Sequence, residues 1–242
     1  MRDVYLEIAG NDTSDLLLIA DHASNRVPDD MNFGLHPSVF DKHIAIDIGV
    51  DRLSALVAEA LGCPALIANI SRLVVDLHRE HDNPAAIPVE SDGHHIPTNA
   101  ALDEAGRQAR IDRFWHPYHD RAAAMVDQYA PKMLFTLHSF TPQLETRPGE
   151  ERPWQTGILY NQDDRAPRIA IPKLEALGFH VGDNEPYSGR DLNATMNRHA
   201  EARGLPYLAI EVRNDLIANE EGARKWADWL VPVIAETRDA LS

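Results

Sequence analysis

Short runs of apolar residues alternate along this chain with longer segments in which apolar residues recur at helical spacing. The runs suit buried strands, and the longer segments suit helices with one apolar face. The strand-like runs are residues 16–20, 64–70, 73–77, 133–137, 157–160 and 207–210, and the helix-like segments are residues 41–61, 102–129, 193–203 and 220–241. Strands separated by helices predict an α/β fold with a mostly parallel sheet between two layers of helices.

Glycine and proline set the limits of the predicted helices. Gly62, Cys63 and Pro64 end the helix predicted over 41–61, and Pro117 should break or kink the helix predicted over 102–129. No internal repeat and no Gly/Ser linker divides the chain. The 242 residues are therefore predicted to form a single domain, 1–242.

The acidic balance of the chain restricts its partners. The formal net charge is −15, and such a field repels a phosphate backbone, so we expect no nucleic-acid partner. An anionic substrate would need a local cationic pocket. No apolar run approaches the ~20 residues of a membrane-spanning helix, and the charged N-terminus is unlike a secretory signal, so no membrane partner is expected. Cys63 is the single cysteine, which excludes an internal disulfide and favours a reducing, cytoplasmic location.

Three of the predicted strands end in a residue that can bind or serve a metal. His22, His138 and Glu211 each lie at or just beyond the end of an apolar run. In open α/β sheets, ligands bind in the crevice beyond the carboxyl ends of the strands. Residues that are far apart in the sequence can therefore converge on one site without any local metal-binding spacing.

These residue types suit a hydrolytic zinc site. Such a site uses two or three His or carboxylate ligands and keeps one position open for water, whose pKa falls from 15.7 to roughly 7, so that metal-bound hydroxide forms at neutral pH. His22 and His138 can supply imidazole nitrogens, and Asp47, on the predicted helix 41–61, can supply a carboxylate. Glu211 can act as the base that passes the proton to the leaving amine. The sequence thus predicts one divalent metal, with zinc expected, although Co and Mn also accept such ligands.

Each residue also has a purely structural interpretation. His22 suits a loop, Asp47 suits a helix cap, and His138 and Ser139 suit a hydrogen-bonded pair. Glu211 follows four apolar residues, where a carboxylate is costly to bury unless it is paired. The four candidate residues are more informative together than any one of them alone.

His119 and His199 lie on predicted helices and could orient the metal ligands through hydrogen bonds, as could Ser139. A structural role is the alternative interpretation for both histidines.

Several segments of the chain resemble a known family, the N-formylglutamate amidohydrolases. The similar segments are DHASNRVP at 21–28, HIAIDIG at 43–49, SRLVVDLHR at 71–79, IPTN at 96–99, PYH at 117–119, LHSF at 137–140, NRHA at 197–200 and IEVRNDL at 210–216. They follow the order of the family from near residue 16 to near residue 217, which is most of the chain. Each segment alone is a weak signal, whereas the set is specific.

The resemblance implies a fold and a set of ligands. The family is similar to the zinc carboxypeptidases and aspartoacylases, which implies a three-layer fold around a twisted, mixed, mostly parallel sheet. It implies His22 and His138 as metal ligands and Glu211 as the catalytic residue. Relatives often place the acidic ligand three residues after the first histidine, where this chain has Asn25. The acidic ligand is therefore assigned to Asp47.

The resemblance also implies a site for a substrate carboxylate. Arg79 matches an arginine that holds this carboxylate in the family, and a guanidinium suits such a contact because it can bind both oxygens. His78 stands before it where the family usually has Asn, which bears on the choice of substrate. Arg72 and Arg213 are further candidates for the cationic pocket, with structural ion pairs as the alternative.

The resemblance implies hydrolysis of the N-formyl, or another small N-acyl, amide of an acidic amino acid such as N-formyl-L-glutamate. The expected partner is thus a small anionic N-acyl amino acid. The alternatives are a hydrolase of another N-acyl amino acid or of a cell-wall peptide amide, and a non-catalytic metal-binding or ligand-binding relative. A serine hydrolase is disfavoured because the chain has no Gly-x-Ser-x-Gly segment. The sequence predicts no oligomeric state.

Overall fold

A seven-stranded mixed sheet forms the centre of the molecule. The computed structural model describes residues 4–11 and 13–241. In spatial order the strands are β1 (Tyr5–Ile8), β3 (Ala65–Ala68), β2 (Leu16–Ala20), β6 (Met133–Phe140), β9 (Tyr207–Arg213), β7 (Thr156–Leu159) and β8 (Val181–Asp183). β3, β2, β6 and β9 are mutually parallel, β1 pairs antiparallel with β3, and β7 pairs antiparallel with β9 and parallel with β8.

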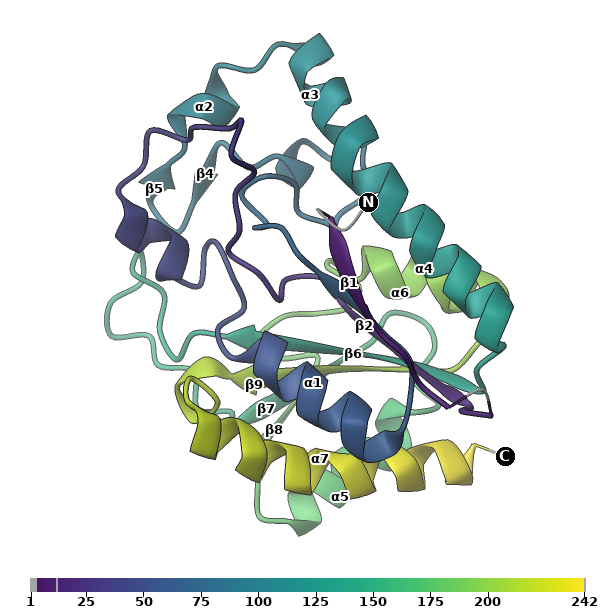
Figure 1. The fold of residues 1–242 in the computed structure, drawn as a ribbon. Coiled ribbons are helices and arrows are strands. Elements are labelled where there is room, and N and C mark those ends of the chain that lie inside the picture. The colour runs from purple at the N-terminus through teal and green to yellow at the C-terminus, as the bar shows by residue number, and fades with distance from the viewer. Residues whose placement is uncertain (1–3, 12, 242) are drawn as a thin grey trace.

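Helices cover both faces of this sheet (Figure 1). One face carries α1 (Val50–Leu61), α5 (Pro167–Ala176) and α7 (Glu220–Ala240). The other carries α4 (His116–Tyr129) and α6 (Ala194–His199), with α3 (Glu104–Arg110) joined to α4 through a π-helical turn at Ile111–Trp115. The remaining elements are α2 (Pro97–Ala100), the hairpin of β4 (Glu90–Ser91) and β5 (His94–His95), and 3₁₀ turns at Pro37–Asp41, Pro84–Ala86, Glu201–Arg203 and Asn214–Leu216. The prediction of a three-layer α/β fold with a mixed, mostly parallel sheet is confirmed.

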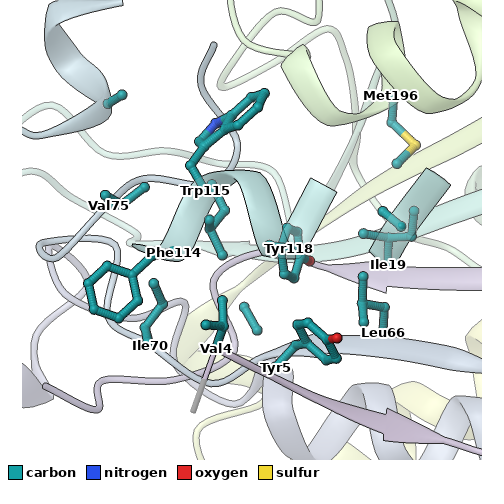
Figure 2. Close-up of a cluster of buried hydrophobic side chains, with 14 of the residues drawn as sticks. Val4, Tyr5, Ile19, Leu66, Ile70, Val75, Phe114, Trp115, Tyr118 and Met196 are labelled. Atoms are coloured by element: carbon teal, nitrogen blue, oxygen red, sulfur yellow. The ribbon is translucent and has the colours of Figure 1, made fainter. Parts of the chain in front are cut away.

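Along the central strands, apolar side chains point alternately to the two faces of the sheet, and each face carries its own apolar core. On β2, Leu17 and Ile19 point to the α4 face, whereas Leu16, Leu18 and Ala20 point to the α1 and α7 face. Successive side chains of a strand point to opposite faces, so a strand buried on both sides must be apolar at every position. Figure 2 shows part of the first core, where Ile19 from the sheet lies in one cluster with Tyr118 of α4 and Met196 of α6.

Two of the predicted elements differ from the structure. The helix predicted over 41–61 begins only at Val50, and residues 42–49 form turns. The run 73–77 is a buried irregular segment and not a strand; its amides bond locally or to other loops, as Val74 does to Ser71 and Asp76 does to Ala86. The helix predicted over 102–129 begins at Glu104 and contains a π-helical turn at Ile111–Trp115, after which Pro117 lies in the first turn of α4. The two edge strands β1 and β8 were not predicted.

No helix among the described residues combines the length and the apolar character needed to cross a membrane.

Candidate active site

A cavity of about 330 Å³ lies where the carboxyl ends of β2, β6 and β9 meet. Loops that follow these strands gather at this end of the sheet, on the left side of Figure 1. The cavity is lined by residues from the strand ends, by residues from the irregular segment 72–79, and by Arg147 and Tyr187 from later loops. A crevice at this edge is where an open α/β sheet binds its ligands.

The three strand-end residues meet in this cavity. His22 follows the last residue of β2 by two positions, and His138 and Glu211 are directly paired residues of the adjacent strands β6 and β9. All three side chains line the cavity and are at least nine-tenths buried. The rings of His22 and His138 have their centroids 5.1 Å apart. The structure thus brings together residues that are more than 70 positions apart in the sequence.

Asp47 joins this group from a turn, and not from a helix as the sequence suggested. It precedes Val50, the first residue of α1, and its amide donates to the carbonyl of His22 (3.0 Å). The turn depends on Gly49, which has φ +84° and whose added Cβ would lie 2.2 Å from the carbonyl oxygen of Ile217. A glycine is therefore required for the chain to enter α1 with Asp47 buried against β6.

The side chains of His22, Asp47 and His138 fit a metal ion. Oδ2 of Asp47 lies 2.9 Å from Nδ1 of His138 and 3.4 Å from Nδ1 of His22. One ligand atom from each residue lies within 4.8 Å of the other two. Nδ1 of His22 is buried and has no hydrogen-bond partner within residues 4–11 and 13–241, which is unusual for a polar atom and is expected of a metal-binding nitrogen. Two imidazoles and one carboxylate form a zinc-type ligand set that leaves a position for substrate.

Asp76 orients His22 and was not singled out from the sequence. Its Oδ1 accepts a hydrogen bond from Nε2 of His22 (2.7 Å), so Nδ1 is left to face Asp47. Arg72 donates to the other oxygen of Asp76 (2.8 Å). Burial would raise the pKa of Asp76, but Arg72 and His22 outweigh it and hold that pKa well below its usual value. A carboxylate behind a ligating histidine fixes its ring and its tautomer.

The carboxylates of Asp76 and Asp47 favour a positive charge at the position of His22. Burial and the nearby Arg72 would lower the pKa of His22, but Asp76 and Asp47 outweigh them and raise it to about 9. The opposite balance holds at His138, where burial lowers the pKa of the ring despite its contact with Asp47.

Replacing Asp76 with Asn should weaken metal binding by roughly 10- to 100-fold, because the amide is neutral and a poorer acceptor for His22. Competition with a chelator of known affinity measures this change. Asp82→Asn, at an exposed aspartate, is the matched control and should bind metal as the wild type does. Equal affinity in Asp76→Asn would show that Asp76 does not support a metal ligand.

Asp21, His78 and His138 form a second group with metal-ligand geometry. The oxygens of Asp21 already have partners: Nδ1 of His78 lies at 2.8 Å and the hydroxyl of Tyr118 at 2.9 Å. Nδ1 of His22 has no such partner. Of the two groups, that of His22, Asp47 and His138 is therefore the one with a buried ligand atom free of other partners. His78 lines the cavity beside it, with its ring centroid 4.6 Å from that of His138.

Glu211 faces the cavity with an unpaired oxygen. Its Oε2 is buried and has no hydrogen-bond partner among the described residues. Burial and the neighbouring charge of Asp47 raise the pKa of Glu211 to about 8, against the opposing effects of His22 and Arg72. A carboxyl group whose pKa lies near neutrality can both accept and return a proton, as general acid–base catalysis requires.

The arginines predicted for the anion pocket do not all reach it. Arg72 and Arg79 line the cavity, but Arg72 is engaged by Asp47 (3.2 Å) and Asp76 (2.8 Å). In the part of the chain that the structure describes, the nearest carboxylate oxygen to Arg79 is 3.8 Å away. The expectation for Arg213 is corrected: it pairs with Asp215 (2.8 Å) and is not part of the cavity lining. Arg147, in the loop between β6 and β7, lines the cavity and was missed because nothing in its local sequence marks it.

The three residues predicted to orient the ligands act at different places. The amide of Ser139 donates to Oδ2 of Asp47 (3.2 Å), and its hydroxyl donates to the carbonyl of Ile48 (3.0 Å). His119 and His199 lie outside the cavity lining and hydrogen-bond to each other (2.9 Å). His119 also bonds the carbonyl of Leu77 (2.9 Å), so this pair supports the segment that carries Asp76 and His78. Burial lowers the pKa values of His119 and His199 to about 3 and about 4, which keeps both neutral.

Comparisons with known proteins place the chain in a family. A family model described as N-formylglutamate amidohydrolase matches residues 14–218. The crystal structure of a gene product from Agrobacterium tumefaciens is similar, with a TM-score of 0.92 and 32% identity over 99% of this chain and 96% of that one. A bacteriophage poly-gamma-glutamate hydrolase matches more weakly, with a TM-score of 0.49 and 12% identity over 96% of this chain and 89% of its own. No curated protein matched the chain.

Proposed function

Because this chain belongs to the N-formylglutamate amidohydrolase family, we propose that it hydrolyses the N-formyl, or another small N-acyl, amide of an acidic amino acid such as N-formyl-L-glutamate. The observation that carries this proposal is the buried Oε2 of Glu211, which has no hydrogen-bond partner among the described residues and lines the same cavity as His22, Asp47 and His138. Metal-assisted amide hydrolysis requires at least a set of metal ligands and an adjacent group that transfers protons.

His22, Asp47 and His138 would hold one divalent metal, with zinc the expected ion. When bound, such a metal lowers the pKa of water and polarises a carbonyl group. Glu211 takes a proton from the attacking water and returns a proton to the amide nitrogen as the C–N bond breaks. For N-formylglutamate the products are formate and glutamate, so the atoms balance with one water consumed.

Arginines in the cavity account for an acidic substrate. Among the described residues, the nearest carboxylate oxygen to Arg79 is 3.8 Å away, and the one carboxylate paired with Arg147 is that of Glu150 at 3.6 Å. Both guanidinium groups can therefore bind a carboxylate of the substrate with both oxygens. On a chain with a net charge of −15, a local cationic lining is needed to admit an anion.

A substrate panel tests the proposed function. The metal-loaded protein is incubated with the N-formyl, N-acetyl and N-succinyl derivatives of glutamate and aspartate, and release of the free amine is measured. We expect N-formyl-L-glutamate to have the highest kcat/KM of the panel. Preference for a larger acyl group would instead favour a hydrolase of another N-acyl amino acid.

Metal uptake without turnover on any member of the panel would contradict the proposal. That result would favour a non-catalytic relative that keeps the fold and the ligands.

A further inference from the structure

Tyr187 lines the cavity, and an arginine fixes its hydroxyl. Nη1 of Arg152 lies 3.0 Å from the phenol oxygen, and the guanidinium lies over the ring, 4.8 Å from its centroid. A guanidinium has only donors, so the phenol oxygen is the acceptor in this hydrogen bond. The hydroxyl proton of Tyr187 must therefore point to a different partner.

Tyr160, elsewhere in this molecule, makes the same two contacts with an arginine. Arg168 donates to its phenol oxygen and lies over its ring, 5.1 Å from the centroid. The hydroxyl of Tyr160 in turn donates to Asp183 (2.5 Å). Tyr187 has no counterpart of Asp183: among the described residues none accepts a hydrogen bond from its hydroxyl.

Tyr187 also lies near the groups proposed for the reaction. Burial raises the pKa of Tyr187 and Arg152 lowers it, while Glu211 raises it and Arg72 lowers it. Glu211 and Arg72 are thus both within electrostatic reach of the phenol. Tyr187 lines the same cavity as Glu211 and the cluster of His22, Asp47 and His138.

We propose that the hydroxyl of Tyr187 donates a hydrogen bond to the carbonyl oxygen of the scissile amide as negative charge develops on that oxygen. The proton stays on Tyr187 throughout, so the step moves no atom. The hydrogen bond from Arg152 polarises the hydroxyl and strengthens it as a donor. A fixed donor aimed at a developing oxyanion stabilises the transition state more than the ground state. This role rests on the proposed amide hydrolysis and adds a residue that the sequence did not mark.

Tyr187→Phe tests the role, because it removes one hydroxyl and keeps the ring under Arg152. Tyr160→Phe is the matched control, since it also removes a hydroxyl that accepts from an arginine, but outside the cavity lining. With N-formyl-L-glutamate, Tyr187→Phe should lower kcat by about 100-fold and change KM by less than about threefold, as loss of one oxyanion donor does. Tyr160→Phe should retain the kcat of the wild type.

Calorimetry supplies a readout that does not depend on turnover. In a Glu211→Gln background, the affinity for N-formyl-L-glutamate should be the same with Tyr187 and with Phe at that position, because the hydroxyl acts on the transition state.

If the wild type is active, two outcomes would overturn this role. An unchanged kcat in Tyr187→Phe would remove the hydroxyl from the reaction. A higher KM with unchanged kcat, together with weaker binding in the calorimetric pair, would assign the hydroxyl to a substrate carboxylate. A wild type that is inactive on every panel member would contradict the proposed function itself, and the role of Tyr187 with it. An active wild type beside an equally active Tyr187→Phe would overturn only the role of Tyr187.

Discussion

Glu211→Gln should lower kcat by roughly 10³- to 10⁴-fold and leave the metal content of the protein unchanged. Glutamine has nearly the same shape as glutamate, but its amide cannot carry a proton from water to the leaving nitrogen. Glu211 is buried in the cavity lining, where an amide of the same size should fit the same space. The expected defect is therefore one of chemistry and not of folding.

Steady-state rates with N-formyl-L-glutamate, thermal unfolding and metal analysis together measure this outcome. Glu175→Gln, at an exposed glutamate, is the matched control and should behave as the wild type does. A kcat within about tenfold of the wild type would be too small a loss for a general base, and would show that another group transfers the proton.

His138→Ala should lose activity by at least about 10³-fold, since a metal in a hydrolytic site supplies several kcal/mol of transition-state stabilisation. The ring of His138 contacts Asp47 at 2.9 Å and lies between the two groups of candidate ligands, so its removal disrupts either metal assignment. The decisive measurement is whether activity returns when zinc is added back after chelation. Wild-type protein stripped by a chelator should regain activity when zinc is added, whereas His138→Ala should not.

Activity that survives exhaustive chelation would contradict metal dependence. Recovery of His138→Ala at the same zinc concentration as the wild type would remove this residue from the ligands.

The sequence predicted the part of the site that regular structure positions. His22 lies just after β2, and His138 and Glu211 lie near the carboxyl ends of β6 and β9. These three strands are neighbours and parallel, and parallel strands place their carboxyl ends at one edge of a sheet. Apolar runs of strand length marked these three strands, so the convergence of their end residues could be inferred from the pattern alone.

Residues in irregular segments were harder to place. Asp47 was assigned to a helix because Ile44 and Ile48 continue the helical spacing of α1 backwards, although those residues belong to turns. Asp76 lies in an apolar run that resembles a strand, and the only signal for it was a carboxylate among buried neighbours. Arg147 and Tyr187 reach the cavity through long loops whose course depends on tertiary packing. Sequence periodicity contains no information about such loops.

Metal content per chain tests the central claim most directly. Wild type, His22→Ala and His180→Ala are purified in parallel, loaded with zinc, freed of excess ion and analysed for bound metal; His180 is exposed and serves as the control. Because the buried, unpartnered Nδ1 of His22 is assigned to the metal, we predict one zinc ion per chain in the wild type and in His180→Ala, and little in His22→Ala. Full occupancy in a folded His22→Ala variant would contradict this account of the site.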